Sequence, residues 1–183
     1  MSSLQTGSVI AAVRTDEELK NALNRNINVI FDLNPDLITI SKKVKKAHDA
    51  GKKLFIHMDL ANGIGKDKSG IMFAKHIGVD GIISTRVNII KIARELVVFT
   101  VQRFFIVDSH SIDTTIDALK ASKADMIEVM PGIVYKVIEK LHQSIQTPII
   151  AGGLIQTGEE VERALSCGAT AVSTGKPELW EEN

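Results

Sequence analysis

The sequence predicts a closed (βα)8 barrel of the TIM type. Short apolar runs alternate with amphipathic helical patterns along the chain, which is typical of a parallel sheet covered by helices. Several runs are nearly continuous in Ile, Val and Ala, as expected of strands buried on both faces. Eight runs are enough to close the sheet and remove its edges. They are residues 9–13, 29–33, 54–58, 81–84, 104–107, 126–130, 148–151 and 171–174.

The connections between these runs are short. The 183 residues fit one domain, residues 1–183, but fall below the ~250 residues typical of this barrel. Helical patterns are clearest at residues 88–100, 113–121, 134–143 and 159–166, and the last helix is reduced to residues 177–183. The apolar stretch 97–107 could hold one long strand; we assign its first half to a helix and its second half to the fifth strand. An open flavodoxin-like sheet is the alternative architecture.

Two of the predicted helices begin with the same pattern. Thr15 is followed three residues later by Glu18, and Thr157 by Glu160. In such a capping box the threonine hydroxyl accepts a hydrogen bond from the glutamate amide, and the glutamate carboxylate accepts one from the threonine amide. The similarity of residues 15–23 to residues 157–165 supports a repeated βα unit.

The composition excludes several classes of protein. Lys plus Arg and Asp plus Glu number 22 each, so no overall field directs the chain to nucleic acid or to a membrane. Cys167 is the only cysteine, which excludes an intrachain disulfide and a zinc site with several cysteines. Residues 1–7 show no signal region, and no apolar run reaches the ~18–20 residues of a membrane span. We expect a cytoplasmic protein without a metal or a cofactor.

Polar side chains stand where the predicted strands end, and TIM barrels bind their ligands at this end. His57 and Asp59 share one face of a strand because side chains alternate in direction. This set favours ligand binding over a hydrogen-bonded network at the barrel mouth, and that network over a metal site, because no third metal ligand has a spacing that the sequence fixes. The candidate ligand-binding residues are Asp32, His57, Asp59, Arg86, Asp108 and Glu128.

The last two strands are each followed by a glycine-bearing turn. The sequence reads AGGL at residues 151–154 and STG at residues 173–175. In this barrel the corresponding loops often hold a phosphate, because glycine lets backbone N–H groups approach the oxygens closely. The alternative is that these glycines only turn the chain. The predicted phosphate-binding residues are Gly152, Gly153, Ser173, Thr174 and Gly175.

Lysines are concentrated around the helix between the second and third strands. Such a run usually forms a solvated helix face, and the alternative is contact with a nucleic-acid backbone. Phe104 and Phe105, beside Arg103, suit the core better than stacking on bases. The lysines are Lys42, Lys43, Lys45, Lys46, Lys52 and Lys53.

Several strings of residues together resemble the glycerol uptake operon antiterminator regulatory protein family. The resemblance extends over nearly the whole chain, and the combination is far more specific than any single glycine pair. The strings are FIHMDL at 55–60, NGIGKDK at 62–68, GIISTR at 81–86, QRFFIVDS at 102–109, IEVMPG at 127–132, PIIAGG at 148–153 and AVST at 171–174.

The resemblance implies a regulator and not an enzyme. Members are similar to phosphate-binding barrels, respond to glycerol 3-phosphate, and act on leader mRNA so that transcription passes a terminator. By position, the phosphate would contact the residues of the two glycine-bearing turns, and the glycerol hydroxyls would contact some of the six candidate ligand-binding residues. The family pattern favours lysine where Arg86 stands and serine where Gly175 stands, and its RNA-contacting residues are not placed on this sequence.

The sequence therefore predicts a sensor in which glycerol 3-phosphate favours a state able to bind leader RNA. The glycine-rich and charged loop at residues 62–70 is the best candidate for a segment that becomes ordered on binding. The alternative is a barrel enzyme, a lyase, isomerase or hydrolase acting on a small phosphorylated metabolite with His57 and Asp59 or Glu128 as acid and base. Association into a homo-oligomer stays open.

Overall fold

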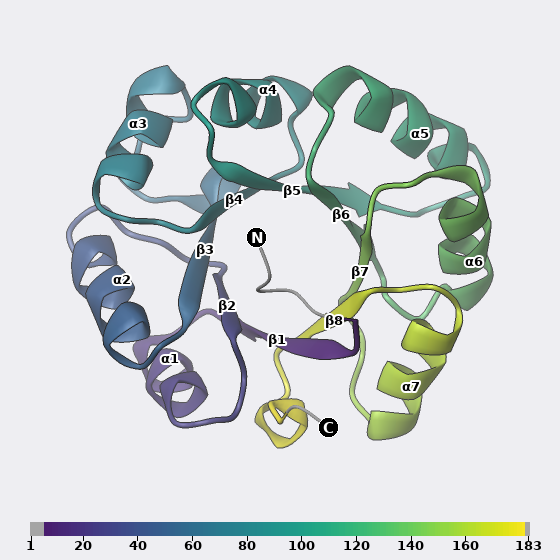
Figure 1. The fold of residues 1–183 in the computed structure, drawn as a ribbon, viewed down its shortest axis with the longest axis horizontal. Coiled ribbons are helices and arrows are strands. Elements are labelled where there is room, and N and C mark those ends of the chain that lie inside the picture. The colour runs from purple at the N-terminus through teal and green to yellow at the C-terminus, as the bar shows by residue number, and fades with distance from the viewer. Residues whose placement is uncertain (1–5, 182–183) are drawn as a thin grey trace.

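The computed structural model describes residues 6–181, and it confirms a closed (βα)8 barrel. Neighbouring strands pair in parallel in chain order, and β1 also pairs with β8, so the ring has no edge (Figure 1). The strands are β1 Ser8–Val13, β2 Val29–Asp32, β3 Lys53–His57, β4 Gly81–Ser84, β5 Phe99–Phe105, β6 Met126–Met130, β7 Ile149–Gly152 and β8 Ala171–Thr174.

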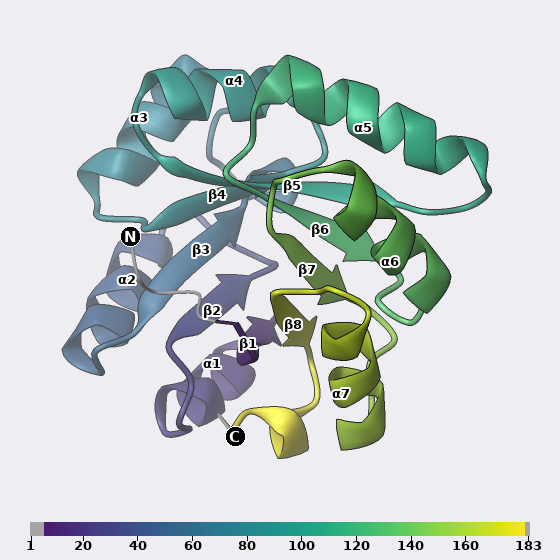
Figure 2. The ribbon, with the colours of Figure 1, turned by 45° about the vertical axis from the view of Figure 1, so that its right-hand side comes forward.

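Helices cover the outside of this ring (Figures 1 and 2). They are α1 Asp16–Leu23, α2 Ile40–Asp49, α3 Lys68–His76, α4 Val87–Glu95, α5 His110–Ser122, α6 Tyr135–Ser144 and α7 Gly158–Ser166. Both predicted capping boxes are present, at Thr15 with Glu18 and at Thr157 with Glu160. The cap of α1, Thr15, lies two residues after β1 ends at Val13, and α7 starts after the longer turn that follows Gly152.

The eighth helix is reduced, as the sequence predicts. A single 3-10 turn, Pro177–Leu179, lies between α1 and α7 where a full helix would otherwise stand (Figure 1). Trp180 follows it and is fully buried, and its indole N–H donates to the carbonyl of Thr174 at 2.8 Å. One large aromatic side chain thus covers a part of the barrel wall that a helix would cover in a longer chain.

The predicted division of residues 97–107 is wrong. α4 ends at Glu95, Val97 takes a left-handed conformation (φ 56°), and β5 begins at Phe99, five residues before the predicted strand. Thr100 and Gln102 interrupt the apolar stretch in the sequence, and in the structure they point outward from β5. Their side chains bond to Asp125 and Ser122. A buried strand can therefore carry polar residues on its helix-facing side when those residues find partners there.

The barrel has two apolar regions separated by its wall. Side chains that point outward pack beneath the helices, and those that point inward fill the barrel from Val29 and Phe31 of β2 across to Met126 and Ile150. The inward residues alternate along each strand, as the pleat requires. Near the carboxyl ends of the strands this apolar filling gives way to charged and polar residues.

Candidate functional site

A cavity of about 150 Å³ opens at the carboxyl ends of the strands. It is bordered mainly by β1, β5, β6 and the turns after β7 and β8. Its size suits a small metabolite rather than a drug-sized molecule or a nucleotide. The lining residues are Ala12, Arg14, Leu33, Arg103, Glu128, Met130, Gly153, Leu154, Ile155, Ser173, Thr174 and Gly175.

The floor of the cavity is a buried polar cluster. Arg103 Nε donates to Glu128 Oε2 at 2.6 Å, and the Ser173 hydroxyl donates to Glu128 Oε1, also at 2.6 Å. All three side chains come from inward positions of β5, β6 and β8, and all are buried. The pair is charged, so its hydrogen bonds are stronger than those between neutral groups. Only one N–H of the guanidinium is used by Glu128, so other donors of Arg103 are available at the cavity.

Gly152 makes room for this cluster. A Cβ atom at this position would lie 2.5 Å from the Ser173 hydroxyl and closer still to the Glu128 carboxylate. Gly152 and Ser173 are paired in the sheet, which brings β7 and β8 together at this point. The residue predicted to bind phosphate therefore acts below the cavity lining, where the absence of a side chain allows Glu128 and Ser173 to meet.

The turns after β7 and β8 meet above the floor. The Thr174 hydroxyl donates to the carbonyl of Ile155 at 2.8 Å and accepts from the backbone N–H of Lys176 at 3.1 Å. Gly153 has a φ of +76°, which L-residues adopt at a cost, and it lies against Met130. Gly153, Ser173, Thr174 and Gly175 thus line one corner of the cavity, and their contact with an anion stays a prediction.

His57 lies in the barrel interior beside this cluster. It is 3% exposed, and its Nδ1 atom has no hydrogen-bond partner among the described residues. Burial, followed by the charge of Arg103, lowers the pKa of His57 to about 4, although Asp59 and Glu128 oppose the shift. The imidazole is therefore neutral at pH 7. An unpaired buried nitrogen is uncommon in proteins, so this atom is a candidate contact for a bound molecule.

Asp59 is occupied by hydrogen bonds. Its carboxylate accepts from the Ser84 hydroxyl at 2.7 Å, and from the Thr85 backbone N–H and hydroxyl at 2.7 and 2.9 Å. Arg86 Nε lies 3.7 Å from the same carboxylate. Partial burial raises the pKa of Asp59, but these hydrogen bonds outweigh burial and hold the pKa below its ordinary value. Asp59 and Arg86 join the turn after β3 to the turn after β4 and do not line the cavity.

Two other predicted ligand residues also lie away from the cavity. Asp32 is fully buried and points outward from β2, where its carboxylate contacts Lys43 Nζ at 3.0 Å. Asp108 is exposed at the start of α5 and accepts hydrogen bonds from the backbone N–H and the hydroxyl of Ser111. These bonds lower the pKa of Asp108. Of the six predicted ligand residues, Glu128 alone lines the cavity, with His57 close to it.

Two arginines of the cavity were not among the predicted site residues. Arg103 was missed because the fifth strand was started at Phe104, and a strand begun at Phe99 places Arg103 on the same face as inward-pointing Val101. Arg14 follows β1 and is exposed, and its backbone N–H donates to Glu18 of the capping box at 2.6 Å. The signal for Arg14 was its position at a strand end.

Neither a metal centre nor a membrane span is indicated. Within residues 6–181 no group of three His, Cys, Asp or Glu side chains is arranged to hold a metal ion. No helix in this part of the chain is long and apolar enough to cross a membrane.

Comparison with known proteins gives the family. The sequence model described as "Glycerol-3-phosphate responsive antiterminator" matches residues 9–180. The chain belongs to this family. The crystal structure of the Listeria monocytogenes glycerol uptake operon antiterminator regulatory protein is similar to this member of the family, with 34% identity, 96% of each chain covered and a TM-score of 0.90. An antiterminator-related protein from Thermotoga maritima shares 31% identity over 96% of this chain and 98% of its own, with a TM-score of 0.86.

Other relatives extend the comparison. The Escherichia coli K12 protein named "Uncharacterized protein YgcP" is 38% identical to this antiterminator family member over 178 residues, or 97% of this chain and 93% of that protein. Orotidine 5'-phosphate decarboxylase from Pyrococcus horikoshii has a TM-score of 0.70 but only 13% identity, with 91% of this chain and 88% of its own covered. At that distance the likeness concerns the fold alone.

Proposed function

We propose that the chain is a glycerol 3-phosphate-responsive regulator that binds this metabolite in the barrel cavity and acts on leader mRNA as a transcription antiterminator. The observation that carries the proposal is the small cavity lined by Gly153, Gly175 and the exposed Arg14 above a buried Arg103–Glu128–Ser173 cluster. Family membership supports the response to glycerol 3-phosphate.

The phosphate group suits the corner formed by the turns after β7 and β8. Gly153 and Gly175 leave this corner without side chains, so an anion could approach the backbone there, and the exposed guanidinium of Arg14 borders the same cavity. An arginine presents a planar fork of donors that matches phosphate oxygens. A corner open to the backbone and the positive charge of Arg14 together favour the doubly charged glycerol 3-phosphate over uncharged glycerol.

The glycerol hydroxyls suit the floor. A hydroxyl group both donates and accepts, so one hydroxyl can donate to Glu128 and accept from a free N–H of Arg103. The neutral imidazole of His57 lies beside these groups with an unpaired Nδ1. Phosphate and hydroxyl recognition at opposite sides of one cavity would distinguish glycerol 3-phosphate from either inorganic phosphate or glycerol.

The geometry favours a sensor over an enzyme of a phosphorylated metabolite. Asp59 is held by three hydrogen bonds and does not line the cavity, and Glu128 is already fixed by Arg103 and Ser173, which suits binding a hydroxyl better than removing its proton. A histidine whose pKa is about 4 is also poorly matched to acid–base work at neutral pH. An enzyme would give product from its phosphorylated substrate, whereas the proposed sensor returns the ligand unchanged.

Thermal unfolding with three ligands tests ligand binding. Glycerol 3-phosphate at about 100 times its dissociation constant should add about 2.7 kcal/mol to stability. Inorganic phosphate and glycerol at the same concentration should add much less. Arg14→Gln should reduce the shift given by glycerol 3-phosphate, while Arg86→Gln, at an arginine outside the cavity, should leave it unchanged. Equal shifts for all three ligands would contradict the proposed site.

Transcription in vitro tests the regulatory half of the proposal. The template carries the leader and terminator of a glycerol-uptake gene from the genome that encodes this chain. Protein and glycerol 3-phosphate together should increase read-through, and either one alone should not. Ligand binding without any change in read-through or in RNA binding would reject the antiterminator role while keeping the metabolite site.

A further inference from the structure

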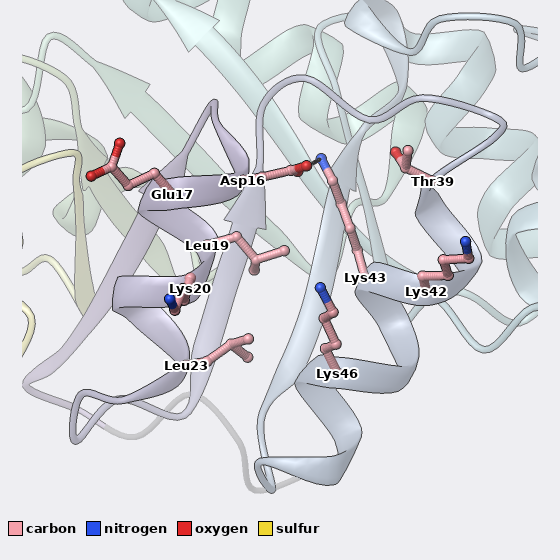
Figure 3. A pocket seen from close by; sticks show the side chains of 9 residues that line it. All are labelled: Asp16, Glu17, Leu19, Lys20, Leu23, Thr39, Lys42, Lys43 and Lys46. Carbon is pink, nitrogen blue, oxygen red and sulfur yellow. Dashed lines mark ion pairs between the residues drawn. The ribbon is translucent and has the colours of Figure 1, made fainter.

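A groove of about 720 Å³ lies between α1 and α2, outside the barrel wall and separate from the cavity (Figure 3). Leu19 and Leu23 of α1 supply its apolar part. Its other lining residues are charged or polar, and most of the positive ones come from α2. We call this surface the α1/α2 groove; its lining residues are Asp16, Glu17, Leu19, Lys20, Leu23, Thr39, Lys42, Lys43 and Lys46.

Three lysines of the α1/α2 groove carry uncompensated charge. Lys20, Lys42 and Lys46 are exposed, and their ammonium groups make no ion pair or hydrogen bond with any described residue between 6 and 181. Lys20 comes from α1 and the other two from α2, so the charges lie on both walls (Figure 3). A partner with regularly spaced negative charges would complement this arrangement.

The acidic residues of the groove do not cancel this charge. Asp16 contacts Lys43 Nζ at 3.7 Å, so it is directed to a lysine that is itself buried. Glu17 points away from α2 (Figure 3). The fourth lysine of α2, Lys45, pairs with Asp49 at 2.7 Å and lies outside the lining set.

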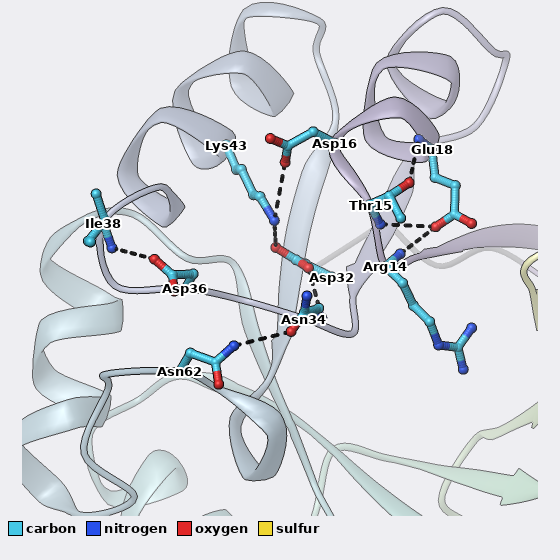
Figure 4. A network of polar contacts seen from close by, with 10 residues as sticks. All are labelled: Arg14, Thr15, Asp16, Glu18, Asp32, Asn34, Asp36, Ile38, Lys43 and Asn62. Atoms are coloured by element: carbon cyan, nitrogen blue, oxygen red, sulfur yellow. Dashed lines mark hydrogen bonds and ion pairs between the residues drawn. The ribbon is translucent and has the colours of Figure 1, made fainter.

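A short network connects the α1/α2 groove to the metabolite cavity. Lys43 lines the groove and bridges Asp16, in the first turn of α1, and Asp32, at the end of β2 (Figure 4). Arg14 lies two residues before Asp16, and Leu33 directly follows Asp32; both line the cavity. The two segments that border the cavity on this side therefore also hold the lysine at the top of the groove.

We propose that the α1/α2 groove binds the sugar–phosphate backbone of the leader RNA through Lys20, Lys42 and Lys46. The inference rests on the proposed function, because it assigns a surface to the RNA partner of that regulator. Lysine contacts to phosphates release counterions, so each contact makes the affinity more sensitive to salt. The groove is open along the helices, which suits an extended polyanion better than a small anion.

The test compares two triple variants of the full chain. The groove variant carries Lys20→Gln, Lys42→Gln and Lys46→Gln. The control variant carries Lys91→Gln, Lys136→Gln and Lys140→Gln, which removes three exposed lysines from α4 and α6, away from the groove (Figure 1). The probe is the labelled leader transcript of a glycerol-uptake gene from the same genome, with glycerol 3-phosphate in excess. Binding is measured from 50 to 200 mM potassium chloride.

The groove variant should bind more weakly at 50 mM salt, and its plot of log affinity against log salt should be shallower by about 2, since each lost contact removes about 0.7 from the slope. The control variant should match the unmodified chain. Both variants should keep the full thermal shift with glycerol 3-phosphate, because none of these lysines lines the cavity.

The inference and the proposed function fail differently. Groove and control variants with the same RNA affinity and salt slope would overturn the inference while leaving the regulator intact. A weaker groove variant with an unchanged salt slope would also overturn it, since the loss would then not come from phosphate contacts. If the unmodified chain binds no leader RNA at any concentration of glycerol 3-phosphate, the proposed function itself is wrong.

Discussion

The guanidinium of Arg103 and the carboxylate of Glu128 form an ion pair inside the barrel, with 2.6 Å between Nε and Oε2. The side chains are 6% and 1% exposed. Two charges so far from water are retained only where each satisfies the other, and the register of β5 and β6 places these two residues directly opposite each other. The pair is thus part of the folded barrel before any ligand arrives.

Replacing Arg103 should destabilise the barrel severely. Arg103→Met leaves the buried Glu128 carboxylate with the Ser173 hydroxyl as its remaining partner among the described residues, and such an unpaired charge costs about 3–5 kcal/mol. Arg86→Met is the control, because the Arg86 side chain is 54% exposed and its pair should contribute at most about 1 kcal/mol. Urea unfolding measures both. Equal losses in the two variants would show that the buried pair is not a structural necessity.

A methyl group at residue 152 should disturb the cavity floor. Gly152→Ala forces Glu128 and Ser173 apart, so we expect a loss of about 1–3 kcal/mol in stability and a much smaller thermal shift with glycerol 3-phosphate. Gly158→Ala, at the start of α7, has open space around the added Cβ and should stabilise the chain by about 0.4–1 kcal/mol. A full ligand shift in the Gly152→Ala variant would argue against a ligand on this floor.

The neutral state of His57 should appear as a pH dependence of stability. Burial, then the charge of Arg103, lowers its pKa from 6.5 to about 4, so below pH 6.5 the unfolded chain binds a proton that the folded chain does not. The free energy of unfolding therefore keeps its full value, as far as His57 is concerned, above pH 6.5. It falls as the pH is lowered toward 4, by about 3 kcal/mol for a pKa shift of this size.

The variant His57→Gln isolates this effect from the carboxylates that titrate in the same range. The free energy of unfolding is measured at pH 7 and pH 4.5 for both proteins. The unmodified chain should lose more stability than the variant between these values. A His57 ring proton whose NMR shift titrates near pH 6.5 in the folded chain would contradict the expected pKa.

Lys43 should stabilise the fold because its ammonium group neutralises the buried carboxylate of Asp32. Lys43→Met removes the ammonium group 3.0 Å from a fully buried carboxylate and should lower the free energy of unfolding by about 3 kcal/mol or more. Adding Asp32→Leu to this variant should restore much of the loss. Lys45→Met, on the same helix, breaks an exposed pair with Asp49 and should cost less than about 1 kcal/mol. A double variant no more stable than Lys43→Met would contradict this account.

The sequence was sufficient for the barrel because strand and helix patterns have different periods. It was not sufficient for the start of β5, where Leu96, Val97 and Val98 between α4 and the strand are as apolar as the strand itself. That boundary depends on a left-handed residue and on partners for Thr100 and Gln102 that lie 25 and 20 residues away in the sequence. The same error concealed Arg103, whose inward direction follows only from the correct strand start.

For the site, the sequence located the end of the barrel better than the individual side chains. Asp32 could have been placed outward, because Phe31 and Leu33 on either side of it fit the inward face. Asp59 and Asp108 follow their strands in turns, where the alternation of a strand no longer applies. The two glycine-bearing turns lie at the cavity because the position of a turn depends on the fold and not on a side-chain torsion, and their binding of phosphate stays a prediction.

The bridge made by the Thr174 hydroxyl, between the Ile155 carbonyl and the Lys176 amide, has a consequence for how a signal would leave the barrel. Because these hydrogen bonds already hold the turn after β8, we expect its backbone to move little when an anion binds there. The cationic side chain beside this corner is Arg14, which follows β1, the strand paired with β8, and is exposed. We therefore expect an anion to reposition the Arg14 side chain more than the turn that the Thr174 hydroxyl fastens.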